Sequence, residues 1–124
     1  MRVLLIILLF INQLFSQSFG QNKVQYDSFD WDYIVSPNTN VYYYGDNYDL
    51  AIFTSKVAEK SIEQIGKHLR WRSSTPIKII VYTSHNDFQQ TNVVNVYMSE
   101  GIGGVTELYK NRIVIPFEGS YEQF

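Results

Sequence analysis

The sequence predicts an α+β fold, a small mixed β-sheet with one long helix and one short helix against one face, plus a C-terminal β-hairpin. Three observations predict it. Apolar residues recur at helical spacing from Ala51 to Leu69. Residues 77–82 form a run rich in β-branched side chains, apolar enough for a strand covered on both faces. Near the end of the chain, two strand-like segments are separated only by a lysine and an asparagine, as in a tight hairpin.

Two short strands are expected before the long helix. The segments Trp31–Val35 and Val41–Tyr44 combine aromatic and β-branched residues between turn-forming residues. Ser36 and Pro37 stop the first of them. The connection is short enough for the two strands to pair as a hairpin.

The long helix has a choice of capping residues. Asp46, Asn47 and Asp49 precede its first apolar turn, and each has a side chain that can accept a hydrogen bond from a free backbone amide. Pro76 closes the helical region. We expect the strand at residues 77–82 to lie at the centre of the sheet.

A short helix is predicted after this central strand. Ser84 is followed three residues later by Asp87, a spacing that resembles a capping box. The helix is expected to run from His85 to about Asn92.

The C-terminal hairpin is expected to follow a glycine-bearing loop at residues 99–104. Its strands are Val105–Tyr109 and Arg112–Phe117, joined by residues 110–111. Residues 118–124 are assigned no element of their own.

The first 20 residues are typical of a helical, cleavable signal peptide. Arg2 supplies a positive region and Val3–Ile11 an unbroken apolar run, which stops at about half of the roughly 20 residues that a membrane span needs. Ser18 and Gly20 are small residues that favour a cut after Gly20, with a cut after Ser16 as the fallback. The sequence therefore predicts export to the periplasm, cell envelope or exterior, with membrane contact only through the signal peptide.

The remaining chain is interpreted as a flexible lead-in at residues 21–30 and one domain at residues 31–124. The sequence has 10 lysines and arginines against 12 aspartates and glutamates, a balance that gives no indication of a nucleic-acid partner. It has no cysteine, which excludes disulfides and thiolate metal sites.

The polar residues do not encode a metal site. His68 and His85 lie outside any H-E-x-x-H arrangement. We expect His68 to interact with the C-terminus of the long helix and His85 to lie on the surface of the first turn of the short helix. Asp27, Asp30 and Asp32 lack the spacing of an EF-hand loop and are interpreted as solvated surface. No catalytic residue and no metal ligand are predicted.

Tyrosines at positions 42, 43, 44 and 48 allow two interpretations. They could form a stacking platform for sugar or peptide. The interpretation that we favour is a two-sided strand, with one aromatic face in the core and the other partly in water.

Four segments of the chain carry a resemblance to a known family. They are PIKIIVYTS at 76–84, NDFQQTN at 86–92, EGIGGVTE at 100–107 and KNRIVIPFEGSY at 110–121. These segments resemble the start of a family of exported bacterial proteins in which a gluzincin-like (peptidase MA-type) zinc metallopeptidase domain precedes a β-propeller of TolB or dipeptidyl-peptidase-like repeats. The resemblance covers residues 31–124 and includes no catalytic motif.

The resemblance implies a zinc metallopeptidase whose zinc site lies outside this chain. In the family, the stretch that matches Arg112–Phe124 leads into a helix bearing H-E-x-x-H, whose histidines bind zinc and whose glutamate activates water. We therefore expect an N-terminal fragment of a secreted or cell-envelope peptidase, itself inactive and free of cofactor. Zinc and a downstream β-propeller are expected only in a longer form.

The resemblance also implies a place for a peptide substrate. In gluzincins, the edge strand before the zinc helix can pair with extended substrate backbone, and Gly103–Leu108 occupies that place here. Gly104, Val105 and Glu107 are the expected substrate-facing residues, with Glu107 meeting a positive group. The alternative is an ordinary hairpin strand with an exposed glutamate.

Two noncatalytic functions also stay open. One is an envelope binding module that holds peptide or glycan on the tyrosine-rich strands. The other is a domain that only docks the downstream propeller, which predicts an exposed apolar face in the isolated chain.

Overall fold

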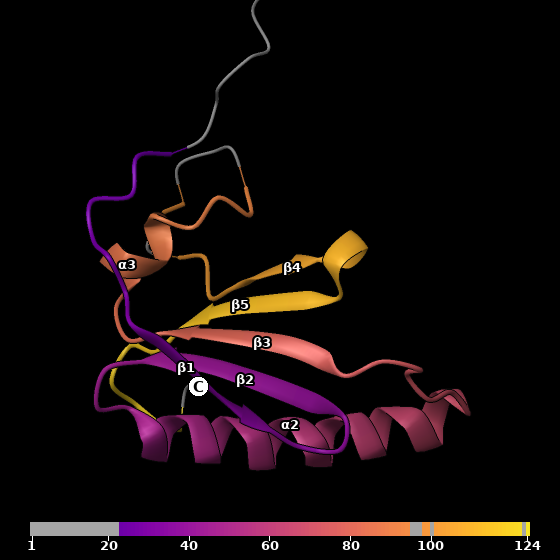
Figure 1. The fold of residues 1–124 in the computed structure, drawn as a ribbon. Coiled ribbons are helices and arrows are strands. Elements are labelled where there is room, and N and C mark those ends of the chain that lie inside the picture. Colours follow the sequence, from indigo (N-terminus) through magenta and orange to yellow (C-terminus); the bar gives the residue numbers. More distant parts are fainter. Residues whose placement is uncertain (1–22, 95–97, 100, 123) are drawn as a thin grey trace, which may run out of the picture.

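The computed structural model describes residues 23–94, 98–99, 101–122 and 124. Within them the chain forms a mixed five-stranded sheet with a long helix along one face, which confirms the predicted α+β fold (Figure 1). The predicted signal peptide at residues 1–20 lies outside the described residues. In the part of the chain that is described, no helix has the length and apolar character needed to cross a membrane.

The regular elements follow the predicted order closely. They are β1 (Trp31–Val35), β2 (Thr39–Tyr44), α2 (Tyr48–Leu69), β3 (Ile77–Tyr82), α3 (His85–Gln89), β4 (Val105–Glu107), the 3-10 helix η1 (Leu108–Lys110) and β5 (Arg112–Pro116). The sheet order is β1-β2-β3-β5-β4, so β3 is central as predicted. Strands β2, β3 and β5 are parallel, and the two edge strands β1 and β4 are antiparallel to their neighbours.

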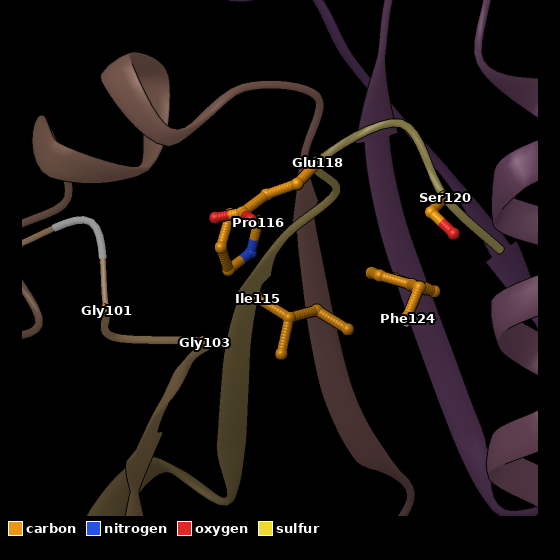
Figure 2. A pocket seen from close by; sticks show the side chains of 7 residues that line it. All are labelled: Gly101, Gly103, Ile115, Pro116, Glu118, Ser120 and Phe124. Atoms are coloured by element: carbon orange, nitrogen blue, oxygen red, sulfur yellow. The ribbon is translucent and has the colours of Figure 1, made fainter. Parts of the chain in front are cut away.

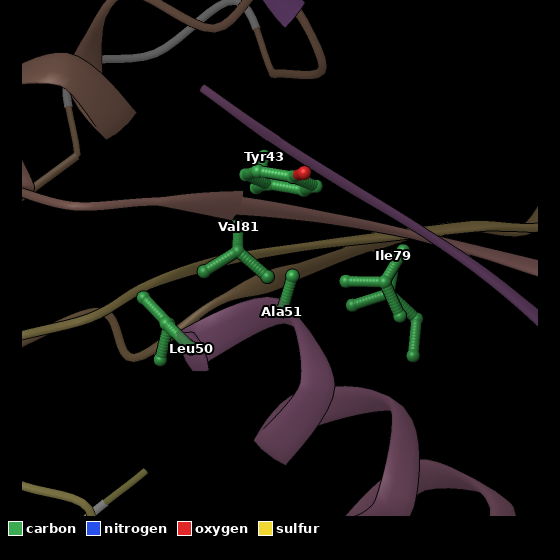
Figure 3. Packing of buried hydrophobic residues seen from close by; sticks show 6 residues of the cluster. Tyr43, Leu50, Ala51, Ile79 and Val81 are labelled. Carbon is green, nitrogen blue, oxygen red and sulfur yellow. The ribbon is translucent and has the colours of Figure 1, made fainter. Parts of the chain in front are cut away.

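The main core lies between the sheet and α2. Successive side chains of a strand point to opposite faces, so alternate residues of β2 and β3 face the helix. A fully buried valine, leucine or isoleucine side chain contributes about 1.5–3 kcal/mol to the free energy of folding. Figure 3 shows the cluster, which consists of Val41, Tyr43, Leu50, Ala51, Ile79 and Val81.

A second core lies on the opposite face of the sheet. Phe88 of α3 is fully buried there with Tyr82, Met98 and Val114. The prediction that both helices pack against one face is therefore wrong. A five-residue helix with one anchoring aromatic carries no periodicity that indicates which face it covers.

The two helices begin near their predicted residues but are capped differently. Asn47 is the N-cap of α2, yet its side chain donates to the carbonyl of Tyr44 (2.7 Å) instead of accepting from the helix. Ser84 caps α3 as predicted, since its hydroxyl accepts from the amide of Asp87 at 3.1 Å. Helix α3 ends at Gln89, which is earlier than predicted.

The connection between β4 and β5 is longer than the predicted two-residue turn. Leu108 and Tyr109 leave the strand and form η1, with side chains that are almost fully in water. Asn111 then takes a left-handed conformation (φ +48°), and its side-chain Nδ2 donates to the carbonyl of Pro76 at 3.2 Å. This contact ties the turn to the residue that precedes β3.

Glu59 of α2 stabilises the turn between β1 and β2. Its carboxylate accepts hydrogen bonds from Ser36 Oγ (2.6 Å), from Thr39 Oγ1 (3.1 Å) and from both the backbone and side-chain nitrogens of Asn38 (2.9 and 2.7 Å). Burial alone would raise the pKa of Glu59, but the hydrogen bonds outweigh it and hold the pKa below the ordinary value of 4.5. The ionised carboxylate is therefore the form that the fold prefers.

We expect the stability that Glu59 contributes to depend on pH. Because its pKa is lower in the folded state, the contribution is complete above the unfolded value of 4.5 and is lost as the pH falls through the folded pKa. The measurement compares the free energy of unfolding of the natural chain and Glu59→Gln between about pH 7 and about pH 3. The difference should shrink toward acid, and a difference that does not change with pH would contradict this role.

Candidate functional site

The predicted substrate strand, β4, is an edge strand of the sheet that the described residues form. On one side β4 pairs with β5 in the antiparallel register Val105 to Val114, Thr106 to Ile113 and Glu107 to Arg112. On its other side no strand lies beside it among the described residues (Figure 1). Such an edge offers backbone N–H and C=O groups to another extended chain.

Gly104 allows the start of β4 to lie close against β5. Its φ is +156°, and a Cβ atom at this position would lie 2.8 Å from Ile115 Cγ2 and 3.0 Å from the carbonyl oxygen of Val114. Only glycine fits both the dihedral and the space. The residue therefore has a structural function next to the predicted substrate edge.

Val105 and Glu107 are both partly buried within the fold. Val105 packs against the core on the α3 side. The Glu107 carboxylate pairs with Lys110 (2.9 Å) and accepts from Arg112 Nε (2.9 Å) and Nη2. Lys110 chiefly, with help from Arg112, lowers the pKa of Glu107. A positive substrate group would have to replace the exposed Lys110, and the role of Glu107 toward substrate stays a prediction.

A small cavity lies beside the start of β4 (Figure 2). Its volume is about 220 Å³, below the range of typical small-molecule sites but enough for one side chain of a peptide. Gly101 and Gly103 border it and leave open space where a Cβ would lie. The other lining residues come from the end of β5 and the tail after it: Ile115, Pro116, Glu118, Ser120 and Phe124.

Among the described residues that line this cavity, Glu118 is the one with an ionisable side chain. Its Oε1 lies 3.8 Å from His85 Nδ1 of α3, which is buried and has no hydrogen-bond partner among the described residues. The His85 side chain is 12% exposed, so its predicted surface position is wrong. Sequence reasoning missed Glu118 because it lies outside any regular element. Its position just beyond the carboxyl end of a parallel strand is the signal that could have found it.

The described residues do not form a metal site. They contain no group of three or more histidines, aspartates or glutamates placed to hold an ion. His68 and His85, at the end of α2 and the start of α3, lie on different elements and are not brought together. A zinc ion would need ligands from outside the described residues. We therefore assign no zinc-dependent step to the described residues.

The four tyrosines of the predicted platform lie in different places. Tyr43 is buried on the α2 side, whereas Tyr42 and Tyr44 lie on the other face of β2. Tyr48 is exposed at the start of α2. The two-sided strand is therefore confirmed, and the four rings do not form one surface.

Tyr44 belongs to a hydrogen-bonded network that links β2 to α3. Its hydroxyl donates to Asp87 Oδ2 (2.6 Å) and accepts from the amide of Thr83 (2.9 Å). Burial, together with the Asp87 carboxylate, raises the pKa of Tyr44 to about 12. The phenol stays protonated and has a structural function.

Comparisons of the whole chain with protein-family models, curated proteins and solved structures find no match.

Proposed function

We propose that this chain is the sheet subdomain of an exported gluzincin-like zinc peptidase, and that β4 is the strand to which an extended peptide substrate pairs. The observation that carries the proposal is the free antiparallel edge at β4, which lies in the order of elements where the resemblance expects a substrate strand. A hairpin strand inside the sheet would have no free side to offer.

The surroundings of β4 suit an extended peptide. The substrate backbone would add as a further strand and exchange hydrogen bonds with residues 105–107. One substrate side chain would enter the cavity beside Gly103, where the Glu118 carboxylate favours a positive or hydrogen-bond-donating group. Affinity would come from the main chain and selectivity from this cavity.

The chemistry of hydrolysis would come from a segment that carries H-E-x-x-H. When bound there, zinc would activate water and polarise the substrate carbonyl. The described residues of this chain would position the peptide relative to that segment. They supply no ligand, so the chain alone should not hydrolyse peptides.

The experiment that tests this proposal is to sequence genomic DNA and transcript downstream of the Phe124 codon. We expect an open reading frame that continues into a helix-forming segment with H-E-x-x-H, because the resemblance puts that helix directly after the stretch matching β5 and its tail. A stop codon at this point, or a continuing frame without the motif, would contradict the proposal and favour a noncatalytic binding or propeller-docking domain.

A further inference from the structure

A second cavity lies on the sheet face opposite α2, away from the outer edge of β4. Its volume is about 330 Å³, within the range of small-molecule sites. Tyr42 of β2 and Ile80 of β3 are register neighbours and both line it, as does Arg112 of β5. Trp31 and Tyr82 add aromatic surface. We call this cavity the aromatic groove.

The rings of the aromatic groove are held in place by other rings. Trp31 packs edge-on against Phe29, Tyr44 and Tyr82, with centroid distances of 5.7, 5.1 and 5.4 Å. It nevertheless keeps 38% of its surface exposed. Tyr42 stacks on Tyr33 at 5.6 Å. A ligand that stacks on Trp31 or Tyr42 would therefore meet a surface that is already ordered, which reduces the entropic cost of binding.

The rim of the aromatic groove is polar and is also held in place. Gln25 and Asn92 line it, and the Asn92 side-chain oxygen accepts the backbone amide of Lys23 at 2.7 Å. Nearby, the Gln90 side-chain oxygen accepts hydrogen bonds from the backbone amides of Tyr26 and Asp27. These bonds attach the lead-in to the segment after α3.

Hydrogen-bond donors are available along this rim. Because the Asn92 oxygen is occupied, its NH₂ group is the part left to contact a ligand. Arg112 gives two N–H groups to Glu107 and has others to donate. The same ion pair balances the arginine charge, so the groove offers donors without a strong positive field.

This combination discriminates between ligand classes. A nucleic acid would need an excess of positive charge along the groove. An extended peptide would need a free strand edge, but the strands that supply Tyr42, Ile80 and Arg112 have neighbours on both sides. Strand β1, which supplies Trp31, is an edge strand, and its unpaired side is the one away from β2 and the rest of the groove. A sugar ring has an apolar C–H face and a periphery of hydroxyl oxygens, which match ordered aromatic faces surrounded by amide and guanidinium donors.

We propose that the aromatic groove binds a short, uncharged glycan. One sugar ring stacks on Trp31 or Tyr42, and its hydroxyl oxygens accept hydrogen bonds from Asn92, Gln25 and Arg112. This inference is independent of the proposed peptidase function, because it uses neither the outer edge of β4 nor a metal.

The test uses the chain with Trp71→Phe, which leaves Trp31 as the only tryptophan of the two in the sequence. Its fluorescence is titrated with chitotriose, cellotriose and maltotriose, and with trialanine as the peptide probe. We expect at least one trisaccharide to change the emission saturably, with a dissociation constant of about 1 mM or lower, and trialanine to cause no saturable change. The absence of saturation with all three sugars, or saturation with trialanine alone, would overturn the proposal.

Variants then locate the bound sugar. Tyr42→Ala removes a stacking surface and Asn92→Ala an exposed donor, and each should weaken binding about tenfold. Tyr48→Ala is the matched control, since Tyr48 is 55% exposed at the start of α2 and outside the groove. Its affinity should equal that of the parent chain. Equal weakening by Tyr48→Ala, or no weakening by either groove variant, would show that the sugar binds elsewhere and overturn the assignment.

Discussion

Replacing Gly104 with alanine should destabilise the fold by about 2–4 kcal/mol, although it adds a single methyl group. The new Cβ would lie 2.8 Å from Ile115 Cγ2 and 3.0 Å from the Val114 carbonyl oxygen. One of these contacts is with backbone that belongs to the β5 strand, which cannot move without disturbing the sheet. The φ of +156° adds strain for any residue with a Cβ. The measurement is the free energy of unfolding in urea.

Gly103→Ala is the matched control for this prediction. The two glycines are adjacent, but a Cβ at Gly103 meets nothing within 4 Å and its φ lies outside the positive range. Its effect should stay within about 0.5 kcal/mol, as for other open surface positions. Equal losses for both variants would mean that the close approach of β4 to β5 is not what requires glycine at position 104.

Replacing Phe88 with alanine should cost about 3–5 kcal/mol. Phe88 is fully buried and is the one buried residue of α3, a helix too short to be stable without tertiary contacts. Its loss would leave a cavity against Tyr82 and Val114 and release α3 from the sheet. Since small domains are stable by only about 5–15 kcal/mol, this variant should approach the unfolding threshold.

Phe88→Leu keeps this prediction measurable if the alanine variant fails to fold. It retains most of the apolar volume and should cost about 1 kcal/mol, which lowers the melting temperature by about 4–8 °C. Tyr109→Ala is the control, because Tyr109 is fully exposed on η1 and should leave the melting temperature almost unchanged. A Tyr109 variant as unstable as Phe88→Leu would contradict the role assigned to α3.

The edge strand and the aromatic groove share one ion pair. Arg112 lines the groove, and its partner Glu107 lies on β4. A cation that approached Glu107 from the substrate side would compete with Lys110 before it competed with Arg112, because Lys110 is the more exposed of the two. The two surfaces can therefore be occupied together without breaking the Glu107–Arg112 contact.

Local patterns in the sequence determined most of the regular elements. Strands β1 and β3 match their predicted bounds, because alternating or dense β-branched residues are properties of a short segment. The helical spacing located α2, and the Ser84–Asp87 pair located the start of α3. Of the candidate site, the glycine-rich loop before β4 was visible in the sequence, although the tight contact at Gly104 was not.

Tertiary structure alone decided which strands flank the central β3 and which face of the sheet α3 covers. It also brought Glu118 beside His85 and assembled the aromatic groove from residues of β1, β2, β3 and β5. Periodicity indicates which residues of one element share a face, but it carries no record of which elements become neighbours. Those neighbours are selected by burying the faces of all elements at once, which is why both candidate surfaces appear only in the folded chain.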